Sequence, residues 1–180
     1  MNIKNIEIKV RNQNPEKVRR ILKSRNALYK GKYHQKDTYF KISHGRLKLR
    51  EVQTDTFLIF YDRENKKGPK KSKVMMFRAV PDSSLKLILM KALEVLVVVE
   101  KQREIYFINN VKVHIDDVKG LGSFIEIEAA DNKGSFTDKE LLNQCKSFLN
   151  LFEIHYENLI SCSYSDLLIN KAHNIKKKKL

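Results

Sequence analysis

Three cations alternate with two leucines along residues 46–50, in the order Arg46, Leu47, Lys48, Leu49 and Arg50. Successive side chains of a β-strand point to opposite faces, so this spacing puts the three cations on one face and the leucines on the other. Three like charges on one face repel each other and need water, acidic neighbours or a polyanion to offset them. Taken alone, the segment fits an antiparallel strand with a solvated face. The rest of the chain favours a site for a polyanion.

Other charged residues are sorted among the predicted strands. Acidic residues occupy the first, seventh and eighth strands, and two further cations occupy the sixth. They are Glu7, Asp116, Glu126 and Glu128, and Lys101 and Arg103. An open sheet would leave these faces in water. A sheet curled into a tunnel would turn them inward and set an acidic wall against a basic wall.

Such a tunnel predicts a particular chemistry. Two carboxylates about 4 Å apart repel by roughly 4 kcal/mol at an effective dielectric constant of about 20, so several in one cavity would take up protons or divalent cations. Oxygen donors suit Mg²⁺ or Mn²⁺. Metals on the acidic wall and Lys and Arg on the other would together grip a polyphosphate.

The elements that position these residues follow from hydrophobic periodicity and capping signals. Eight segments alternate as strands, and four segments carry helix signals. The predicted strands are 3–10, 37–42, 46–51, 56–62, 73–79, 97–108, 111–117 and 124–130. The predicted helices begin at Asn14-Pro15, at Pro81-Asp82-Ser83, at the capping box Thr137-Asp138-Lys139-Glu140, and near Tyr164. The second helix has Leu85, Ile88, Leu89, Leu93 and Leu96 on its apolar side. The fold class is therefore α+β, an eight-stranded antiparallel β tunnel or barrel with helices packed outside.

Composition bounds the class of protein. The 180 residues carry a formal net charge of +15, and because five of these charges are the lysines of residues 171–180, residues 1–170 still carry +10. We expect one domain over residues 1–170 and a basic, disordered tail over 171–180. Two cysteines give no disulfide framework, and the chain shows no signal peptide and no apolar run long enough to cross a bilayer. We expect a cytoplasmic protein without a membrane partner.

Eight short stretches of the sequence resemble, in their order and spacing, the motifs of a known family. They are Asn5 to Lys9, Lys36 to Phe40, Gly45 to Glu51, Gly68-Pro69-Lys70, Lys101-Gln102-Arg103, His114 to Val118, Gly120 to Glu128, and Ser163 to Leu168. Over about residues 2–169 the chain resembles the CYTH superfamily, the triphosphate tunnel metalloenzymes, and within it the class IV (CyaB-type) adenylyl cyclase branch. The family's N-terminal motif is E-x-E-x-K, and here Asn5 stands in place of its first glutamate.

The resemblance implies roles for named residues. Glu7, Asp116, Glu126 and Glu128 would hold the metals, two Mg²⁺ or Mn²⁺ ions. Lys9, Lys48, Arg50, Lys70, Lys101 and Arg103 would bind the triphosphate. Catalysis would rest on Glu7, Lys9, Asp116, Glu126 and Glu128. His114, beside Asp116, fits a structural hydrogen-bonded histidine at least as well as a base.

Three functions remain open at this stage. The first is an adenylyl cyclase that converts ATP into cyclic AMP and pyrophosphate. The second is a triphosphatase that hydrolyses inorganic, thiamine or nucleoside triphosphate with the same phosphate-binding residues. The third is a non-catalytic module that binds polyphosphate or RNA; the carboxylates oppose RNA binding except through the lysine-rich tail. The protein would be a monomer or a homodimer.

Overall fold

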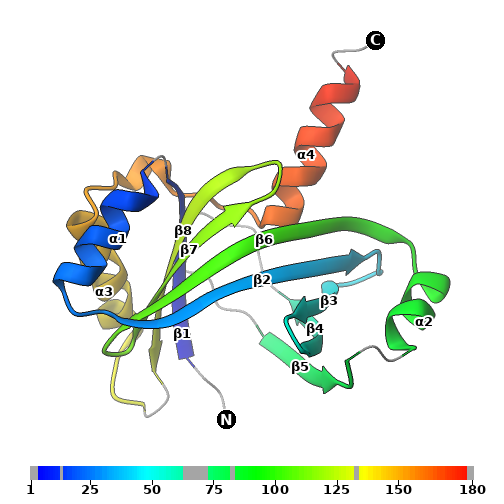
Figure 1. The fold of residues 1–180 in the computed structure, drawn as a ribbon, viewed down its shortest axis with the longest axis horizontal. Helices are drawn as coiled ribbons and strands as arrows, with labels where there is room; N and C mark the ends of the chain where they lie inside the picture. The colour runs from blue at the N-terminus through cyan, green and yellow to red at the C-terminus, as the bar shows by residue number, and fades with distance from the viewer. Residues whose placement is uncertain (1–3, 13, 63–72, 82–83, 132–133, 178–180) are drawn as a thin grey trace.

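The computed structural model describes residues 4–12, 14–62, 73–81, 84–131 and 134–177. Eight antiparallel strands form one strongly curled sheet, a half-barrel, in the order β1-β8-β7-β6-β2-β3-β4-β5 (Figure 1). The strands are β1 (Lys4–Arg11), β2 (Leu28–Phe40), β3 (Arg46–Val52), β4 (Asp55–Asp62), β5 (Lys73–Ala79), β6 (Val95–Ile108), β7 (Val111–Val118) and β8 (Gly122–Asp131). The predicted α+β class with eight antiparallel strands is confirmed.

Four α-helices accompany the sheet. They are α1 (Pro15–Ser24), α2 (Leu85–Ala92), α3 (Asp138–Leu151) and α4 (Tyr164–Lys177). The predicted start signals are confirmed at two of them. The Asn14 side chain accepts a hydrogen bond from the backbone N–H of Lys17, and Thr137 and Glu140 form a capping box. Among the described residues, no helix is long and apolar enough to span a membrane.

One hydrophobic core lies between the outer face of β1, β8 and β7 and the two helices α1 and α3. Ile6, Ile8 and Val10 of β1 pack there against Val18 and Leu22 of α1. Strands β7 and β8 contribute Val113, Ile115, Ile125 and Ile127, and α3 contributes Leu141, Cys145 and Leu149. Because side chains alternate along each strand, burying these residues outside turns the charged residues of the same strands to the inner face.

A second, smaller core lies on the inner face. Tyr39, Tyr61, Val99 and Phe124 line it, and Tyr164 from the first turn of α4 packs among them. The Phe124 and Tyr164 rings meet edge to face with centroids 5.0 Å apart. Helix α4 therefore begins inside the curl of the sheet and leads away from it (Figure 1).

Besides β8, which begins two residues early at Gly122, four elements differ from their sequence predictions. Strand β2 begins at Leu28, nine residues before the predicted start at Asp37. Helix α2 ends at Ala92 and buries no residue, so the prediction that Leu96 belongs to its apolar side is wrong; Leu96 lies in β6. Helix α4 extends to Lys177, eight residues beyond the predicted end at Ile169, while 178–180 lie outside the described residues. Strand β6 begins two residues early, at Val95.

The turn before β3 requires glycine at position 45. Gly45 has φ +71°, and a Cβ there would lie 2.7 Å from the Phe60 ring. Gly122 is a matched control because its φ is +87° and a Cβ there would meet no atom within 4 Å. Both Gly→Ala changes carry the cost of the left-handed backbone. We predict that Gly45→Ala lowers the free energy of unfolding by about 1–3 kcal/mol more than Gly122→Ala does, because only the first crowds Phe60. Urea unfolding measures both, and equal losses would contradict the prediction.

Candidate active site

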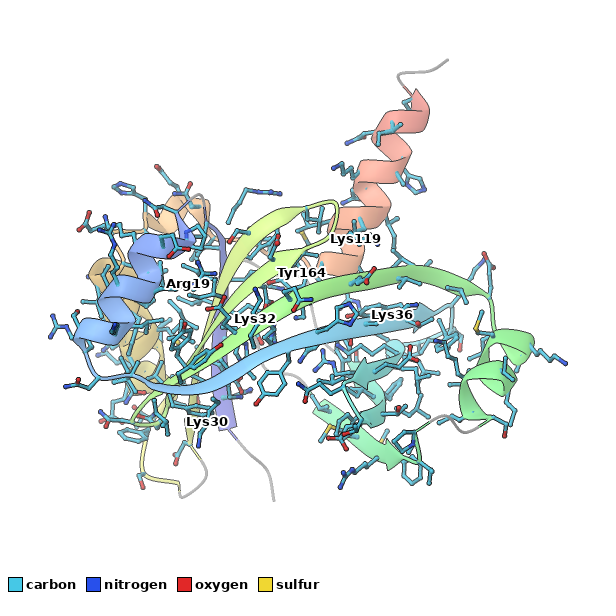
Figure 2. The ribbon with its side chains drawn as sticks, in the orientation of Figure 1. Arg19, Lys30, Lys32, Lys36, Lys119 and Tyr164 are labelled. Atoms are coloured by element: carbon cyan, nitrogen blue, oxygen red, sulfur yellow. The ribbon has the colours of Figure 1, made fainter. Side chains whose placement is uncertain are left out.

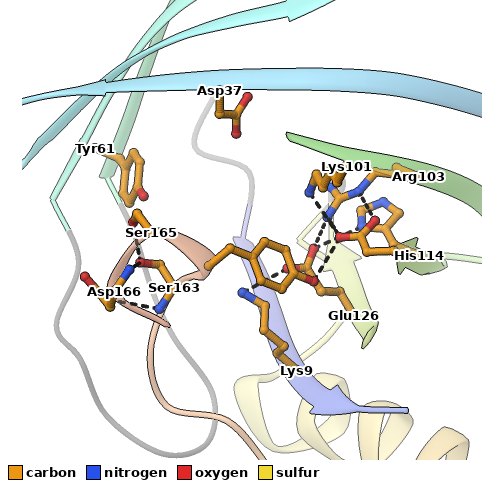
Figure 3. A network of polar contacts seen from close by, with 12 residues as sticks. Lys9, Asp37, Tyr61, Lys101, Arg103, His114, Glu126, Ser163, Ser165 and Asp166 are labelled. Atoms are coloured by element: carbon orange, nitrogen blue, oxygen red, sulfur yellow. Dashed lines mark hydrogen bonds and ion pairs between the residues drawn. The ribbon is translucent and has the colours of Figure 1, made fainter. Parts of the chain in front are cut away.

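The inner face holds a cluster of opposite charges around Asp116, on β7. The Arg103 Nε lies 2.7 Å from Asp116 Oδ1, and the Lys101 Nζ lies 3.0 Å from Asp116 Oδ2. Arg103 also bonds Glu126, whose other oxygen lies 3.0 Å from the Lys9 Nζ. These five residues are 0–7% exposed. We call them, with His114 and Tyr164, the Asp116 cluster (Figure 3).

A second cluster centres on Asp37, on β2. The Lys48 Nζ lies 2.7 Å from Asp37 Oδ2, and the Arg50 guanidinium donates to both Asp37 oxygens, each at 2.7 Å. The Lys48 Nζ also lies 3.4 Å from the Tyr39 hydroxyl, which in turn lies 3.4 Å from the Tyr61 hydroxyl. These five residues form the Asp37 cluster. The Asp37 carboxylate thus pairs with two of the three β3 cations, Lys48 and Arg50, while Arg46 pairs with Asp166 at 3.1 Å.

Strand register explains why the partners meet. Asp116 of β7 lies directly opposite Arg103 of β6, and Asp37 of β2 lies directly opposite Arg50 of β3. Directly opposite residues of an antiparallel pair have Cβ atoms about 4.5–5.5 Å apart, which suits a salt bridge. Lys9 and Glu126 are opposite each other in the same way, on β1 and β8.

Tyr164, at the start of α4, contacts three other members of the Asp116 cluster. Its hydroxyl donates to Asp116 Oδ2 at 2.9 Å, and its ring lies under the Lys9 Nζ, with 4.0 Å from the nitrogen to the ring centroid. The Lys101 Nζ is 4.9 Å from the same centroid. The ring thus contacts two of the cations and one carboxylate.

Burial and pairing set the protonation of these groups in opposite directions. Burial alone would raise the pKa values of Asp37 and Asp116, but the adjacent cations hold both well below the ordinary aspartate value. Burial lowers the pKa of Lys48 to about 7 and that of Lys101 to about 8, against the attraction of their carboxylate partners. Burial likewise lowers the pKa of His114 to about 4, so this imidazole is neutral at physiological pH. The carboxylates stay ionised, and the two lysines titrate near neutrality.

The sequence-predicted residues occupy three kinds of place. Seven lie in the two clusters: Lys9, Lys48, Arg50, Lys101, Arg103, Asp116 and Glu126. Glu128 lies beside them on β8, bonded to Lys112 at 2.7 Å and to Asn5 at 3.0 Å. Glu7 is half-buried opposite Glu128. Lys70 lies outside the described residues.

The arrangement differs from the predicted acidic wall facing a basic wall. Cations and carboxylates alternate, because register places Asp37 opposite Arg50 and Asp116 opposite Arg103. Neither pairing was predicted from the sequence, and Asp37 was not among the predicted site residues. Tyr164 was also missed as a contact to the charged groups. A signal for Asp37 was present, since it stands two residues before Tyr39 on a strand whose odd positions face inward. His114 bonds Glu126 through Nδ1 at 3.3 Å, in keeping with the structural role.

In the arrangement described, the four predicted metal ligands do not form a metal site. They are Glu7, Asp116, Glu126 and Glu128. No group of three or more His, Cys, Asp and Glu side chains is placed to hold an ion in the part of the chain that the structure describes. Asp116 is bound by Arg103 and Lys101, and Glu126 by Lys9 and Arg103. A divalent cation needs oxygens whose charge is not already neutralised in this way. We therefore derive no step through a metal.

Comparisons with known proteins agree with the fold. The sequence profile described as CYTH domain matches residues 4–154. A protein of Methanocaldococcus jannaschii, named as a candidate adenylate cyclase, is 29% identical over 176 residues, covering 90% of this chain and 97% of that protein.

Solved structures share the fold. The PH1012 protein of Pyrococcus horikoshii superimposes with a TM-score of 0.79 at 23% identity, covering 91% of this chain and 99% of that one. A structure from Vibrio parahaemolyticus, named as a candidate adenylate cyclase, has a TM-score of 0.74 at 18% identity, covering 91% and 97%.

Removing the Asp37 charge should reveal how strongly the structure depends on it. Asp37→Asn keeps the size of the side chain but leaves the buried Lys48 and the half-buried Arg50 without their carboxylate. We predict a loss of about 3–5 kcal/mol in the free energy of unfolding, the usual cost of breaking a buried ion pair from one side. The control is Glu16→Gln, which removes an exposed partner of Arg19 and should change stability little. Similar unfolding midpoints for both variants would contradict the buried ion-pair account.

Proposed function

The chain belongs to the CYTH domain family, and we propose that it is a class IV adenylyl cyclase-like enzyme that converts ATP into cyclic AMP and pyrophosphate. The observation that supports this most is the surplus of inward-facing cations. Lys9, Lys48, Arg50, Lys101 and Arg103 face Asp37, Asp116 and Glu126, which is five positive charges against three negative ones, a surplus of two. A polyphosphate is the ligand class that such a set of cations recognises.

Two arginines suit the phosphate groups in particular. Arg50 and Arg103 each present a planar guanidinium that now makes bidentate contact with a carboxylate. A phosphate group offers the same pair of acceptor oxygens, so it can replace the carboxylate without a change in hydrogen-bond pattern. The β- and γ-phosphates would therefore exchange with Asp37 and Asp116 for the two guanidinium groups.

The proposed reaction is an in-line displacement at the α-phosphorus. The ribose 3′-oxygen forms a bond to that phosphorus while the bond to the oxygen bridging the α- and β-phosphates breaks, and the hydroxyl proton passes to solvent. Pyrophosphate leaves with added negative charge, which the buried cations stabilise in a medium of low dielectric. Enzymes of this family generally use divalent metals, which supply Lewis-acid stabilisation of the phosphate oxygens.

A triphosphatase is the second candidate function. This function is favoured by the side chains of the two clusters, which are suited to binding phosphate groups rather than a nucleobase or a ribose. Water attacking the terminal phosphorus would use the same cations. A nucleic-acid module is disfavoured, because the cations of the two clusters are buried or half-buried inside the curled sheet, whereas a nucleic-acid backbone is bound by cations along an accessible surface.

Product analysis separates the two enzymes. Purified protein is incubated with ATP, inorganic triphosphate or thiamine triphosphate, each with Mg²⁺, with Mn²⁺ or with chelator, and the products are resolved by ion-exchange chromatography. We expect ATP to give cyclic AMP with equimolar pyrophosphate. Arg103→Met should abolish this activity. The control Lys32→Gln should retain it, because Lys32 is an exposed cation on the outer side of β2 (Figure 2).

Other products would contradict the proposal. ADP and orthophosphate without cyclic AMP, or cleavage of inorganic triphosphate alone, would identify a hydrolase. Retention of full activity by Arg103→Met would show that the inner cations are not the site.

Binding of inorganic triphosphate should depend on pH through Lys48. The polyphosphate binds the ammonium form, and the pKa of Lys48 is lowered to about 7 by burial, so affinity should be highest below this pH and fall as pH rises. One titrating group gives at most about a tenfold loss per pH unit, since 1.36 kcal/mol corresponds to one pKa unit. In Lys48→Arg the guanidinium stays protonated, so the fall should be shallower and reflect Lys101. Calorimetric titration across the neutral range measures both proteins. Identical pH profiles would contradict the assignment.

A further inference from the structure

Gln35 of β2 lies on the inner face, next to both charge clusters but outside their ion pairs. The pairing of β2 with β6 is regular over residues 31–39, so Gln35 shares the inner face with Asp37, two residues later. Register places Lys101 of β6 directly opposite Gln35 on one side, and Val52 of β3 directly opposite it on the other. Gln35 is therefore adjacent to a member of each cluster, Asp37 along its own strand and Lys101 across the sheet.

The side-chain oxygen of Gln35 is an unused hydrogen-bond acceptor. Gln35 is 7% exposed, and its buried Oε1 accepts no hydrogen bond from any residue that the structure describes. Folded proteins retain few such atoms, because an unpaired buried acceptor lowers stability. Two neighbouring cations are bonded elsewhere: the Lys101 Nζ lies 3.0 Å from Asp116 Oδ2, and the Arg50 Nε lies 2.7 Å from Asp37 Oδ1. The amide oxygen is thus free to accept a hydrogen bond from a ligand.

The chemistry of this oxygen limits which part of a ligand it can contact. Ionised phosphate oxygens accept hydrogen bonds and do not donate them, so the triphosphate itself cannot satisfy Gln35. A divalent cation at the same place would be repelled by the adjacent Lys101 and Arg50. A neutral O–H or N–H group is what remains. The ligand must therefore carry a neutral donor close to its phosphate chain.

A nucleoside triphosphate meets this requirement, and inorganic triphosphate does not. The ribose is joined directly to the triphosphate and carries two hydroxyl groups, whereas the amino group of the base lies farther along the molecule. Gln35 is next to both clusters that would bind the phosphates, so the ribose is the part of the nucleoside that comes within its reach. A site with an acceptor for a substrate hydroxyl selects against a ligand that lacks this group, because the acceptor is then left unpaired.

We propose, on the basis of the function proposed above, that Gln35 Oε1 accepts a hydrogen bond from a ribose hydroxyl of a nucleoside triphosphate. Gln35 is then a specificity-determining residue. It makes the site prefer a nucleoside triphosphate to inorganic triphosphate, and it holds the ribose beside the phosphate-binding cations.

Isothermal titration calorimetry of the wild-type chain and Gln35→Met tests this assignment. The ligands are ATP, 2′-deoxy-ATP, 3′-deoxy-ATP and inorganic triphosphate, each with chelator to prevent metal-dependent turnover and again with Mg²⁺. Gln35→Met should weaken ATP about 3- to 10-fold, the usual net effect of one hydrogen bond, and leave inorganic triphosphate unchanged. The wild-type chain should lose a similar factor for one deoxy analogue, and the variant should bind that analogue and ATP equally.

The variant should fold, because methionine replaces an unpaired acceptor with an apolar group of similar length. Its unfolding midpoint in urea should not fall, and the deoxy comparison needs only the wild-type chain. The matched control is Gln102→Met. Gln102 follows Lys101 on β6 and so lies on the opposite face, where register pairs it with the exposed His34 and Asp117. It should keep the wild-type ratio of ATP affinity to inorganic triphosphate affinity.

Arg103→Met in the same titrations separates failure of this inference from failure of the proposed function. It should weaken ATP and inorganic triphosphate alike, and unchanged affinities would overturn the site and the Gln35 assignment together. With Arg103→Met impaired, equal wild-type affinity for ATP and both deoxy analogues would overturn the ribose contact alone. So would equal losses of ATP and inorganic triphosphate in Gln35→Met. Weaker wild-type binding of purine riboside triphosphate, which lacks the amino group, in place of either deoxy analogue would assign the oxygen to the base and also overturn it.

Discussion

Pairing of buried charges is the constraint on which the rest of this structure depends. Asp116 is completely buried, and Lys101 and Arg103 beside it are 4% and 7% exposed. An ionised group removed from water is stable only when opposite charges and hydrogen bonds replace its hydration. The curl of the sheet supplies these partners, because it brings inward-facing positions of six strands, β1, β2, β3, β6, β7 and β8, around one interior. Losing one carboxylate would leave cations buried without compensation.

The same pairing shapes what the interior can bind. A polyphosphate entering the site must take Arg50 and Arg103 from Asp37 and Asp116, so part of its binding free energy is offset by the loss of those ion pairs. In return, the arginines are already oriented, and little conformational entropy is lost when phosphate replaces carboxylate. Short anions would gain too little to compete at both clusters. The arrangement therefore favours a long anion over a monophosphate.

Strand alternation was enough to predict most of the fold from the sequence. Apolar and charged residues alternate clearly in β1, β3, β7 and β8, and each of these strands is found where it was predicted. The first half of β2 was missed because Lys30, Lys32 and Lys36 share that segment with tyrosines and give no apolar face. Helix α4 was predicted too short, since propensity weakens after Ile169 while the helix continues. Helix α2 was expected to bury an apolar side, but none of its residues is buried, and Leu87 and Ile88 are 63% and 57% exposed.

The site was predicted only in part, because a sequence pattern shows which face of a strand a residue occupies but not which residues of other strands lie beside it. Alternation shows which residues face inward, and it identified Lys48, Arg50, Lys101, Arg103, Asp116 and Glu126 as part of one charged set, to which the family resemblance added Lys9. It does not show which strands become neighbours, so the pairing of Asp37 with Arg50 and of Asp116 with Arg103 required the register. The contact of Tyr164 with Asp116 required the path of the chain after β8 back to the sheet.

A crystal structure with bound inorganic triphosphate tests the central claim most directly. The account predicts the triphosphate inside the curled sheet, with phosphate oxygens in hydrogen-bond contact with Lys48, Arg50, Lys101 and Arg103, and with both guanidinium groups released at least partly from Asp37 and Asp116. Triphosphate bound on the outer surface, for instance along Lys30, Lys32 and Lys36 of β2, with both buried ion pairs intact, would contradict it.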